Sequence, residues 1–412
     1  MKKFIKITVL LLIINSTFQI HSSFSQGGWI SQNSGSTNDL WDVNLIDINT
    51  GTVVGSDYTI LRTTNSGTSW ISQLSGTTWN LTGVFFTDAN TGTVVGDGGT
   101  ILRTTNGGTN WSSQLSGTTN ILYDVAFTDV NTGTAVGGSG TILRTTNGGT
   151  NWISQSSGTI WNLLSVFFTN VDEGTTVGGS GTILRTTNGG TNWTSQLSGT
   201  TNWLLSVFFT DVNTGTVVGM FGTILKTTNG GANWTPQLSG TTNWLTSVFF
   251  TDANTGTIVG EEGTILRTTN KGMIWSLQTS GTTNDLNDIF FLDANTGTIV
   301  GKGGLILRTT NGGVFVNQIS SEVPERFSLH QNYPNPFNNQ TIIKFDIKKK
   351  GDYRLVIYDC LGRKRDEVFN EYMNAGSYSV SFNGDELQSG VYFYRLSADG
   401  NVVETRKMML IK

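Results

Sequence analysis

Along most of this chain, short runs of apolar residues alternate with polar turns that are rich in Gly, Asn, Asp and Ser. Between Trp111 and Trp152, the apolar residues of 122–127 indicate a first strand, and the runs at 134–137 and 141–145 indicate a second and a third. An Asn-Gly-Gly turn follows and predicts a hairpin, after which Trp152 opens a fourth strand. The pattern therefore predicts a unit of four short antiparallel strands.

This unit recurs without insertion along the first three quarters of the chain. A tryptophan marks the same point of each copy, every 41 residues, at Trp29, Trp70, Trp111, Trp152, Trp193, Trp234 and Trp275. A unit of about 40 residues with four strands, repeated four to eight times, is typical of a β-propeller. We therefore predict an all-β fold in which residues 26–316 form a seven-bladed β-propeller.

The phase of the repeat bears on how such a ring closes. The segment Trp29–Gln32 precedes any first strand, so it is expected to complete the last blade as its outer strand. The segment Val314–Ile319 competes for this place, with Val316 where an eighth tryptophan would stand. We favour the N-terminal segment because it carries the tryptophan.

The hairpin before each tryptophan has the pattern Thr-x-Asn-x-Gly-x-x-Trp, as in Thr104, Asn106, Gly108 and Trp111. It resembles the Asp-box of sialidase-type propellers, with Asn in place of the usual Asp. The whole unit, with its Gly-Thr-Ile-Leu-Arg-Thr-Thr-Asn phrase, resembles the photosystem II stability and assembly factor family over about 29–315. This resemblance implies a seven-bladed propeller that acts as a binding scaffold without chemistry of its own.

After Gly313 the repeat stops, and we predict a linker over 317–325 and a second domain over 326–412. Alternating apolar residues in this domain predict a small antiparallel, immunoglobulin-like β-sandwich. Its motifs resemble the type A sorting domain of type IX secretion cargo in Bacteroidetes. The motif residues that carry the resemblance are Tyr333, Pro334, Asn335, Pro336, Phe337, Gly390, Tyr392 and Lys407.

The sorting-domain resemblance implies a partner and a route. The partner is the type IX secretion machinery, and the route crosses the periplasm to the outer-membrane surface or the medium, followed by removal of the module. The first 25 residues agree with export, because three lysines precede the apolar run 7–14 and small serines follow it, as in a signal peptide. No later segment predicts a membrane span.

Composition narrows the chemistry. The net charge of −4 argues against nonspecific nucleic-acid binding, and the single cysteine, Cys360, excludes an intrachain disulfide. The two histidines, His21 and His330, lie outside the predicted propeller, so it lacks His-based nucleophilic catalysis and His-based metal sites. We predict no cofactor and a monomer.

One cation recurs at an equivalent position in every repeat, and we interpret this set as maintaining the fold rather than as a sialidase-type arginine cluster. The set comprises Arg62, Arg103, Arg144, Arg185, Lys226, Arg267 and Arg308.

Positions at which the repeats differ are the candidates for a functional site. Five further tryptophans are expected in the loops that lead into the first strands: Trp41, Trp79, Trp161, Trp203 and Trp244. An exposed rim of such rings suits stacking on a glycan or a protein interface. Alternatively, each ring covers a neighbouring loop and closes the core.

Acidic residues vary in the same region. Asp42, Asp124 and Asp288 share one repeat position, and Asp39 and Asp285 lie nearby in the first and seventh repeats, which closure makes neighbours. The cluster is a solvated acidic rim, a catalytic pair, or a binding site. As a binding site it would take a ligand at Asp42, Asp124 and Asp288 or calcium at Asp39, Asp42, Asp285 and Asp288. The sequence thus predicts a secreted or surface-attached, non-enzymatic scaffold for a glycan or protein. The alternative is an extracellular glycoside hydrolase that uses the seam aspartates.

Overall fold

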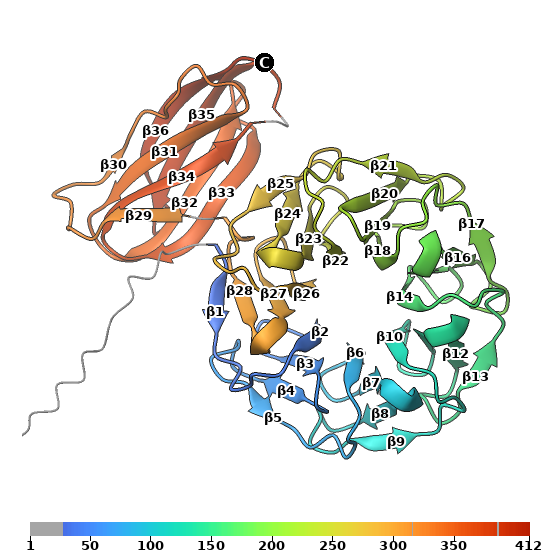
Figure 1. Ribbon diagram of the computed structural model, residues 1–412. Coiled ribbons are helices and arrows are strands. Elements are labelled where there is room, and N and C mark those ends of the chain that lie inside the picture. Colours follow the sequence, from blue (N-terminus) through green and yellow to red (C-terminus); the bar gives the residue numbers. More distant parts are fainter. Residues whose placement is uncertain (1–27, 315, 385–386) are drawn as a thin grey trace, which may run out of the picture.

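The computed structural model describes residues 28–314, 316–384 and 387–412, so the predicted signal peptide lies outside the described residues. Seven four-stranded antiparallel sheets form a ring, and two further four-stranded sheets form a separate module beside it (Figure 1). The predicted all-β propeller is confirmed, as is the β-structure of the C-terminal part.

Each sheet of the ring, called a blade below, is a meander that runs outward from the axis. The innermost strands are β2 (Leu40–Leu45), β6 (Leu81–Phe86), β10 (Leu122–Phe127), β14 (Leu163–Phe168), β18 (Leu204–Phe209), β22 (Leu245–Phe250) and β26 (Leu286–Phe291). The second strands are β3 (Gly51–Gly55), β7 (Gly92–Gly96), β11 (Gly133–Gly137), β15 (Gly174–Gly178), β19 (Gly215–Gly219), β23 (Gly256–Gly260) and β27 (Gly297–Gly301).

The outer half of each blade is shorter. The third strands are β4 (Ile60–Thr63), β8 (Ile101–Thr104), β12 (Ile142–Thr145), β16 (Ile183–Thr186), β20 (Thr223–Thr227), β24 (Ile265–Thr268) and β28 (Ile306–Thr309). The fourth strands are β5 (Ile71–Ser72), β9 (Ser112–Gln114), β13 (Ile153–Gln155), β17 (Thr194–Gln196), β21 (Thr235–Gln237), β25 (Ser276–Gln278) and β1 (Ile30–Gln32). Short 3₁₀ turns between second and third strands are η1 (Asp97–Gly99), η2 (Gly138–Gly140), η3 (Gly179–Gly181), η4 (Glu261–Gly263) and η5 (Lys302–Gly304).

The N-terminal strand closes the ring. β1 pairs antiparallel with β28, with Ile30 opposite Arg308. The Trp29 ring is buried and meets the Phe291 ring edge-on, with 5.8 Å between centroids. The first and last blades of the ring are therefore joined as the repeat phase predicts.

The repeated tryptophans pack where two blades meet. Trp152 meets Phe127 of its own blade edge-on at 6.0 Å, and its apolar cluster includes Val95 and Ile101 of the preceding blade. The hairpin before each tryptophan is held by its own side chains, since the Thr104 hydroxyl accepts a hydrogen bond from the Gly108 N–H at 2.9 Å. Burial of the ring and the local turn therefore act together to order each blade edge.

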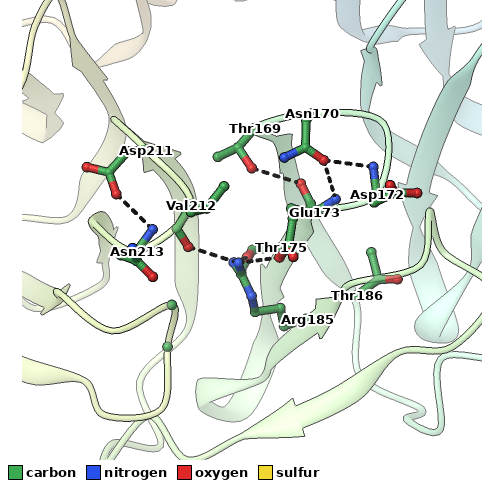
Figure 2. A network of polar contacts seen from close by, with 12 residues as sticks. Thr169, Asn170, Asp172, Glu173, Thr175, Arg185, Thr186, Asp211, Val212 and Asn213 are labelled. Carbon is green, nitrogen blue, oxygen red and sulfur yellow. Dashed lines mark hydrogen bonds and ion pairs between the residues drawn. The ribbon is translucent and has the colours of Figure 1, made fainter.

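The repeated cations connect successive blades (Figure 2). Arg185 donates to the Val212 carbonyl of the next blade at 2.9 Å and to the Thr175 hydroxyl at 3.2 Å, and its guanidinium lies 5.3 Å from the Phe209 ring centroid. It also forms an ion pair of 2.6 Å with Glu173. These contacts support a structural role for the cation set.

The C-terminal module consists of two antiparallel sheets around one apolar cluster. One sheet has the order β29 (Val316–Ser320), β34 (Gly376–Asn383), β31 (Gln340–Ile347) and β30 (Ser328–Leu329). The other has the order β33 (Lys364–Met373), β32 (Gly351–Asp359), β35 (Gly390–Ala398) and β36 (Asn401–Leu410).

The domain boundary differs from the predicted one. Residues 317–320 were expected in the linker 317–325, but they belong to β29, which pairs with β34 of the module. Val316 was placed at the end of the propeller, yet it is fully buried in the core of the module. The segment Val314–Ile319 was considered only as a competing outer strand of the last blade. Its place in the module escaped prediction because it is an edge strand in which only Val316 is fully buried.

Candidate functional site

The innermost strand of every blade contains a bulge. In the first blade, Leu40 pairs with Gly55 and Asp42 pairs with Val54, so Trp41 is the additional residue. The same register shift occurs in all seven blades. A bulge redirects the side chains beside it and interrupts the ladder. It therefore turns the residue after the bulge towards the neighbouring blade.

Residues at the position after the bulge form a ring around the axis, which we call the hub ring. It comprises Asp42, Gly83, Asp124, Ser165, Ser206, Ser247 and Asp288. The Asp42 carboxylate accepts a hydrogen bond from the Val84 N–H of the next blade at 2.6 Å, and Asp124 accepts one from Val166 at 2.8 Å. Ser165 and Ser206 accept equivalent bonds. These hub residues thus bond to the backbone of the next blade, whereas Gly83 has no side chain and Ser247 donates to the Asp288 carboxylate.

Two of the hub carboxyls, Asp42 and Asp124, have raised pKa values. Burial, and then the charge of Asp288, holds the pKa of Asp42 well above its usual range, and Asp42 also shares a hydrogen bond with Asp288. Burial raises the pKa of Asp124 to about 6, against the hydrogen bonds from Val166 and Val125. Ser247 donates to Asp288 at 2.6 Å. These carboxyls are engaged with each other and with the backbone.

This geometry differs from that of a glycosidase. Glycosidases place two carboxyls roughly 5–9.5 Å apart on either side of the bond that they cleave. Asp42 and Asp288 instead share one hydrogen bond, and both accept bonds from backbone N–H groups. The hub ring is therefore better suited to closing the propeller than to acid–base catalysis.

The remaining seam acids surround a cation. Lys302 forms a 2.6 Å ion pair with Asp285, and this hydrogen-bonded contact, followed by the charges of Asp285, Asp39 and Glu261, raises the pKa of Lys302. Asp39 also accepts a hydrogen bond from the Gly303 N–H at 2.9 Å. Among the described residues, no three His, Cys, Asp or Glu side chains are grouped so as to hold a metal ion. The proposed calcium ligands thus divide into the hub pair and a pair beside Lys302.

The five variable tryptophans occupy different environments. Trp41 lies within β2 at the bulge and is half-buried, whereas it was expected in the preceding loop. The other four lie in the loops, as predicted. Trp79 is 53% exposed, Trp161 47% and Trp244 36%, while Trp203 is half-buried. All five rings are therefore at least partly exposed to solvent.

Two pairs of aromatic rings lie on three successive blades, and we call the four rings together the aromatic strip: Trp161 with Trp203, and Phe221 with Trp244. Trp161 and Trp203 both pack over Gly179, since a Cβ there would lie 3.7 Å and 3.4 Å from their rings. Trp244 meets Phe221 edge-on, with 6.4 Å between centroids. The Met220 N–H donates to the Trp203 carbonyl at 2.9 Å. This bond connects the backbone at Trp203 with the turn that carries Phe221.

Phe221 was missed by the sequence analysis. It lies in the turn between β19 and β20, is exposed, and has a φ of 57°. Equivalent turn positions in other repeats hold Asp57, Gly98, Ser139, Ser180, Glu262 and Gly303. An aromatic residue at a turn position that the other repeats fill with small or acidic residues is the signal that could have identified it.

A second apolar feature lies between blades two and three. Trp79 packs over Gly98, where a Cβ would lie 3.0 Å from the ring, and it lines an open depression of about 740 Å³ together with Leu102 and Leu115. A smaller depression of about 570 Å³ borders Ile160 and Trp161. Each of the two depressions is therefore lined by both a tryptophan ring and polar loop residues.

The motif residues of the C-terminal module divide into buried and exposed sets. Phe337 and Tyr392 are buried in the module, and Gly390 begins β35. Tyr333 is 80% exposed, and Pro334, Asn335, Pro336 and Lys407 are exposed as well. The loop that carries Tyr333 to Pro336 is held to the module by the buried residue Asn332. The Asn332 side chain donates to Thr341 at 3.0 Å, and its backbone N–H donates to the Tyr394 hydroxyl at 2.8 Å.

The fold defines a β-propeller followed by a C-terminal module of two β-sheets. The model of the family described as photosynthesis system II assembly factor YCF48 matches residues 113–198, 195–276 and 237–324, together just over half of the chain. The model described as secretion system C-terminal sorting domain matches residues 331–412. The chain therefore belongs to the YCF48 propeller family and ends in a type IX secretion sorting domain. This domain assigns it to the secreted or outer-membrane surface proteins of Bacteroidetes.

Solved structures agree with the fold. A structure described as YCF48 bound to D1 peptide is 22% identical, covers 70% of this chain and 96% of its own, and gives a TM-score of 0.60. YCF48 from Cyanidioschyzon merolae is 21% identical, with coverages of 68% and 98% and a TM-score of 0.59. The WD40 propeller domain of Doa1 is 12% identical, with coverages of 69% and 97% and a TM-score of 0.58. No curated protein matches by sequence.

Within the described residues, no helix combines the length and the apolar character that crossing a membrane requires.

Proposed function

We propose that the propeller is a non-enzymatic binding scaffold outside the cell and that its ligand, an extended glycan or polypeptide chain, lies along the aromatic strip. The observation that carries this proposal is the grouping of Trp161, Trp203, Phe221 and Trp244 over three blades, where the repeats differ most in sequence. Symmetric positions maintain the ring, so a site for one ligand is expected where the symmetry is broken.

The chemistry of the strip suits such a ligand. Flat aromatic faces bind sugar rings or apolar side chains, and aromatic residues dominate binding energy in many interfaces. Polar groups of the same loops order the backbone beside the rings, since the Thr159 hydroxyl accepts a hydrogen bond from the Trp161 N–H at 3.1 Å. The relative described as bound to D1 peptide supports peptide binding by this fold.

The propeller is proposed not to act as a glycoside hydrolase. Asp42 and Asp288 are occupied in the hub ring, and Asp285 is paired with Lys302. We therefore assign the seam aspartates to ring closure and not to a reaction.

The exposed motif residues are proposed to contact the type IX secretion machinery. Tyr333, Pro334, Asn335, Pro336 and Lys407 present side chains to solvent, whereas Phe337 and Tyr392 hold the module together. Recognition by a partner requires the first set, and folding of the module requires the second.

A glycan array and a peptide array probed with the propeller, each with and without calcium, test the proposal. Binding by the wild type that falls at least tenfold in Trp203→Ala and Trp244→Ala, with Trp79→Ala as the matched control, is the expected result. Equal loss in Trp79→Ala, or equal binding by all variants, would place the ligand elsewhere.

A further inference from the structure

In the described part of the chain, the last hairpin of the propeller is followed closely by a strand of the sorting module. β28 ends at Thr309, and the next strand, β29, begins at Val316. In the other blades the hairpin after the third strand leads into the fourth strand of the same blade. In the last blade β1 already occupies this place, so the chain after the hairpin turns away and joins the other module.

β29 is an integral strand of the sorting module. It pairs with β34 with Val316 opposite Val380 and Gln318 opposite Tyr378. Val316 is 0% exposed and belongs to the apolar cluster of the module. Close approach is possible because Gly376 lacks a side chain, since a Cβ there would lie 2.7 Å from the Ser320 carbonyl oxygen. β29 nonetheless precedes residues 331–412, which match the sorting family.

Side chains of the propeller join the module at the same place. Asn311, in the last hairpin, donates to the Val314 carbonyl at 2.8 Å and also to the Glu371 carboxylate of β33. Asn383 of β34 donates to Ser276 of β25 at 3.4 Å. The module therefore lies against the outer edge of the last two blades (Figure 1).

The exposed part of the connection follows the C-terminal end of β29. Between the end of β29 at Ser320 and the start of β30 at Ser328, the residues Glu322, Val323, Glu325 and Arg326 are exposed. A protease therefore finds accessible chain between β29 and β30. Such a cut leaves β29 attached covalently to the propeller.

From this arrangement we propose that β29 is a clasp: a strand on the propeller side that pairs with the β34 edge and keeps the sorting module bound after the chain is cut between β29 and β30. Separation of the two parts then requires a cut on the propeller side of Val316 or a partner that displaces β29 from β34. The sequence 321–326 alone does not govern release.

The test uses the full chain after the signal peptide, with the recognition sequence of a site-specific protease inserted at 321–326. After complete cutting, the two fragments are expected to co-elute in size-exclusion chromatography at micromolar concentration. Val316→Asp is expected to separate them, with at least roughly tenfold weaker association, because it buries a charge without a partner. Ile319→Asp, on the same strand but at a side chain that is 51% exposed, is the matched control and should stay associated.

Two results would overturn the clasp: separation of the cut wild-type fragments, or continued association of the cut Val316→Asp fragments. If the Val316→Asp chain does not fold before cutting, hydrogen exchange on the cut wild type decides. Protection of the β29 amides of 316–320 that persists after cutting supports the clasp, because β29 pairs only with β34 in its sheet, and loss of that protection overturns it.

Discussion

Asp288 of the last blade accepts a hydrogen bond at 3.1 Å from the backbone N–H of Val43 in the first blade. This bond crosses the seam where the two ends of the ring meet. Asp42 makes the equivalent bond to Val84, so the seam is joined at the axis by the same device as an ordinary blade boundary. The ring is thus closed at two radii, by the hub ring inside and by β1 outside.

The hub carboxyls predict an unusual dependence of stability on pH. The folded-state pKa of Asp124 is raised to about 6, above the ordinary value of 3.8, so the folded state binds the proton more tightly than the unfolded state. Its favourable contribution is complete below about pH 4 and is lost as pH rises towards 6. Relative to Asp124→Asn, the wild type should lose about 1–3 kcal/mol of unfolding free energy between pH 4 and 8, measured by urea denaturation.

Asp129 in the same blade is the control for this experiment. Hydrogen bonds from the Asn131 and Thr132 N–H groups lower the pKa of Asp129, so its contribution is lost as pH falls through the acid range. Asp129→Asn should therefore keep the slope between pH 4 and 8. If Asp124→Asn retains the wild-type slope there, burial of Asp124 is not what makes the stability pH-dependent.

Removal of the closing strand should destabilise the ring. Deleting Trp29–Gln32 exposes the edge of β28 and removes a ring that packs on Phe291, so we expect a loss of about 3–5 kcal/mol in unfolding free energy. Hydrogen exchange should accelerate first in β26–β28. An unchanged denaturation midpoint would show that the hub ring alone is sufficient for closure.

Lys226 is the one lysine among the seven equivalent cations, and its replacement tests their role. Arg267 in the next blade donates to both Thr257 at 3.1 Å and the Ala294 carbonyl at 2.8 Å, which a single ammonium group cannot reproduce. Lys226→Arg should therefore raise the unfolding free energy by about 0.5–1 kcal/mol. Arg267→Lys is the reciprocal variant and should lower the thermal midpoint; no change in either direction would contradict an inter-blade role.

Export should depend on the C-terminal module. A chain that ends at Ser320 retains the propeller but lacks Tyr333 to Lys407, so it should accumulate in the periplasm. Cell fractionation and immunoblotting measure this distribution against the full chain. Normal delivery of the truncated chain to the surface would contradict the assignment of the export signal to the sorting module.

Much of the architecture could be predicted from the repeat in the sequence. The 41-residue spacing of tryptophans predicts the strands and the closing role of Trp29–Gln32, because identical units can bury their faces only against copies of themselves. The hub ring was not predictable in detail, since the bulge at Trp41 is defined by pairing with β3. The position of Lys302 between Asp39 and Asp285 also depends on closure, which brings distant repeats together.

Two classes of tryptophan should respond oppositely to truncation. Trp234 is buried between blades and meets Phe209 edge-on at 6.0 Å, so Trp234→Ala should cost about 3–5 kcal/mol of unfolding free energy. Trp244 lies at the surface of the aromatic strip, so Trp244→Ala should change stability by less than about 1 kcal/mol while weakening ligand binding by roughly 1–3 kcal/mol. Thermal denaturation and titration of the array-selected ligand measure the two effects separately. If Trp244→Ala and Trp203→Ala unfold the propeller as Trp234→Ala does, the strip belongs to the core and the proposed ligand site is wrong.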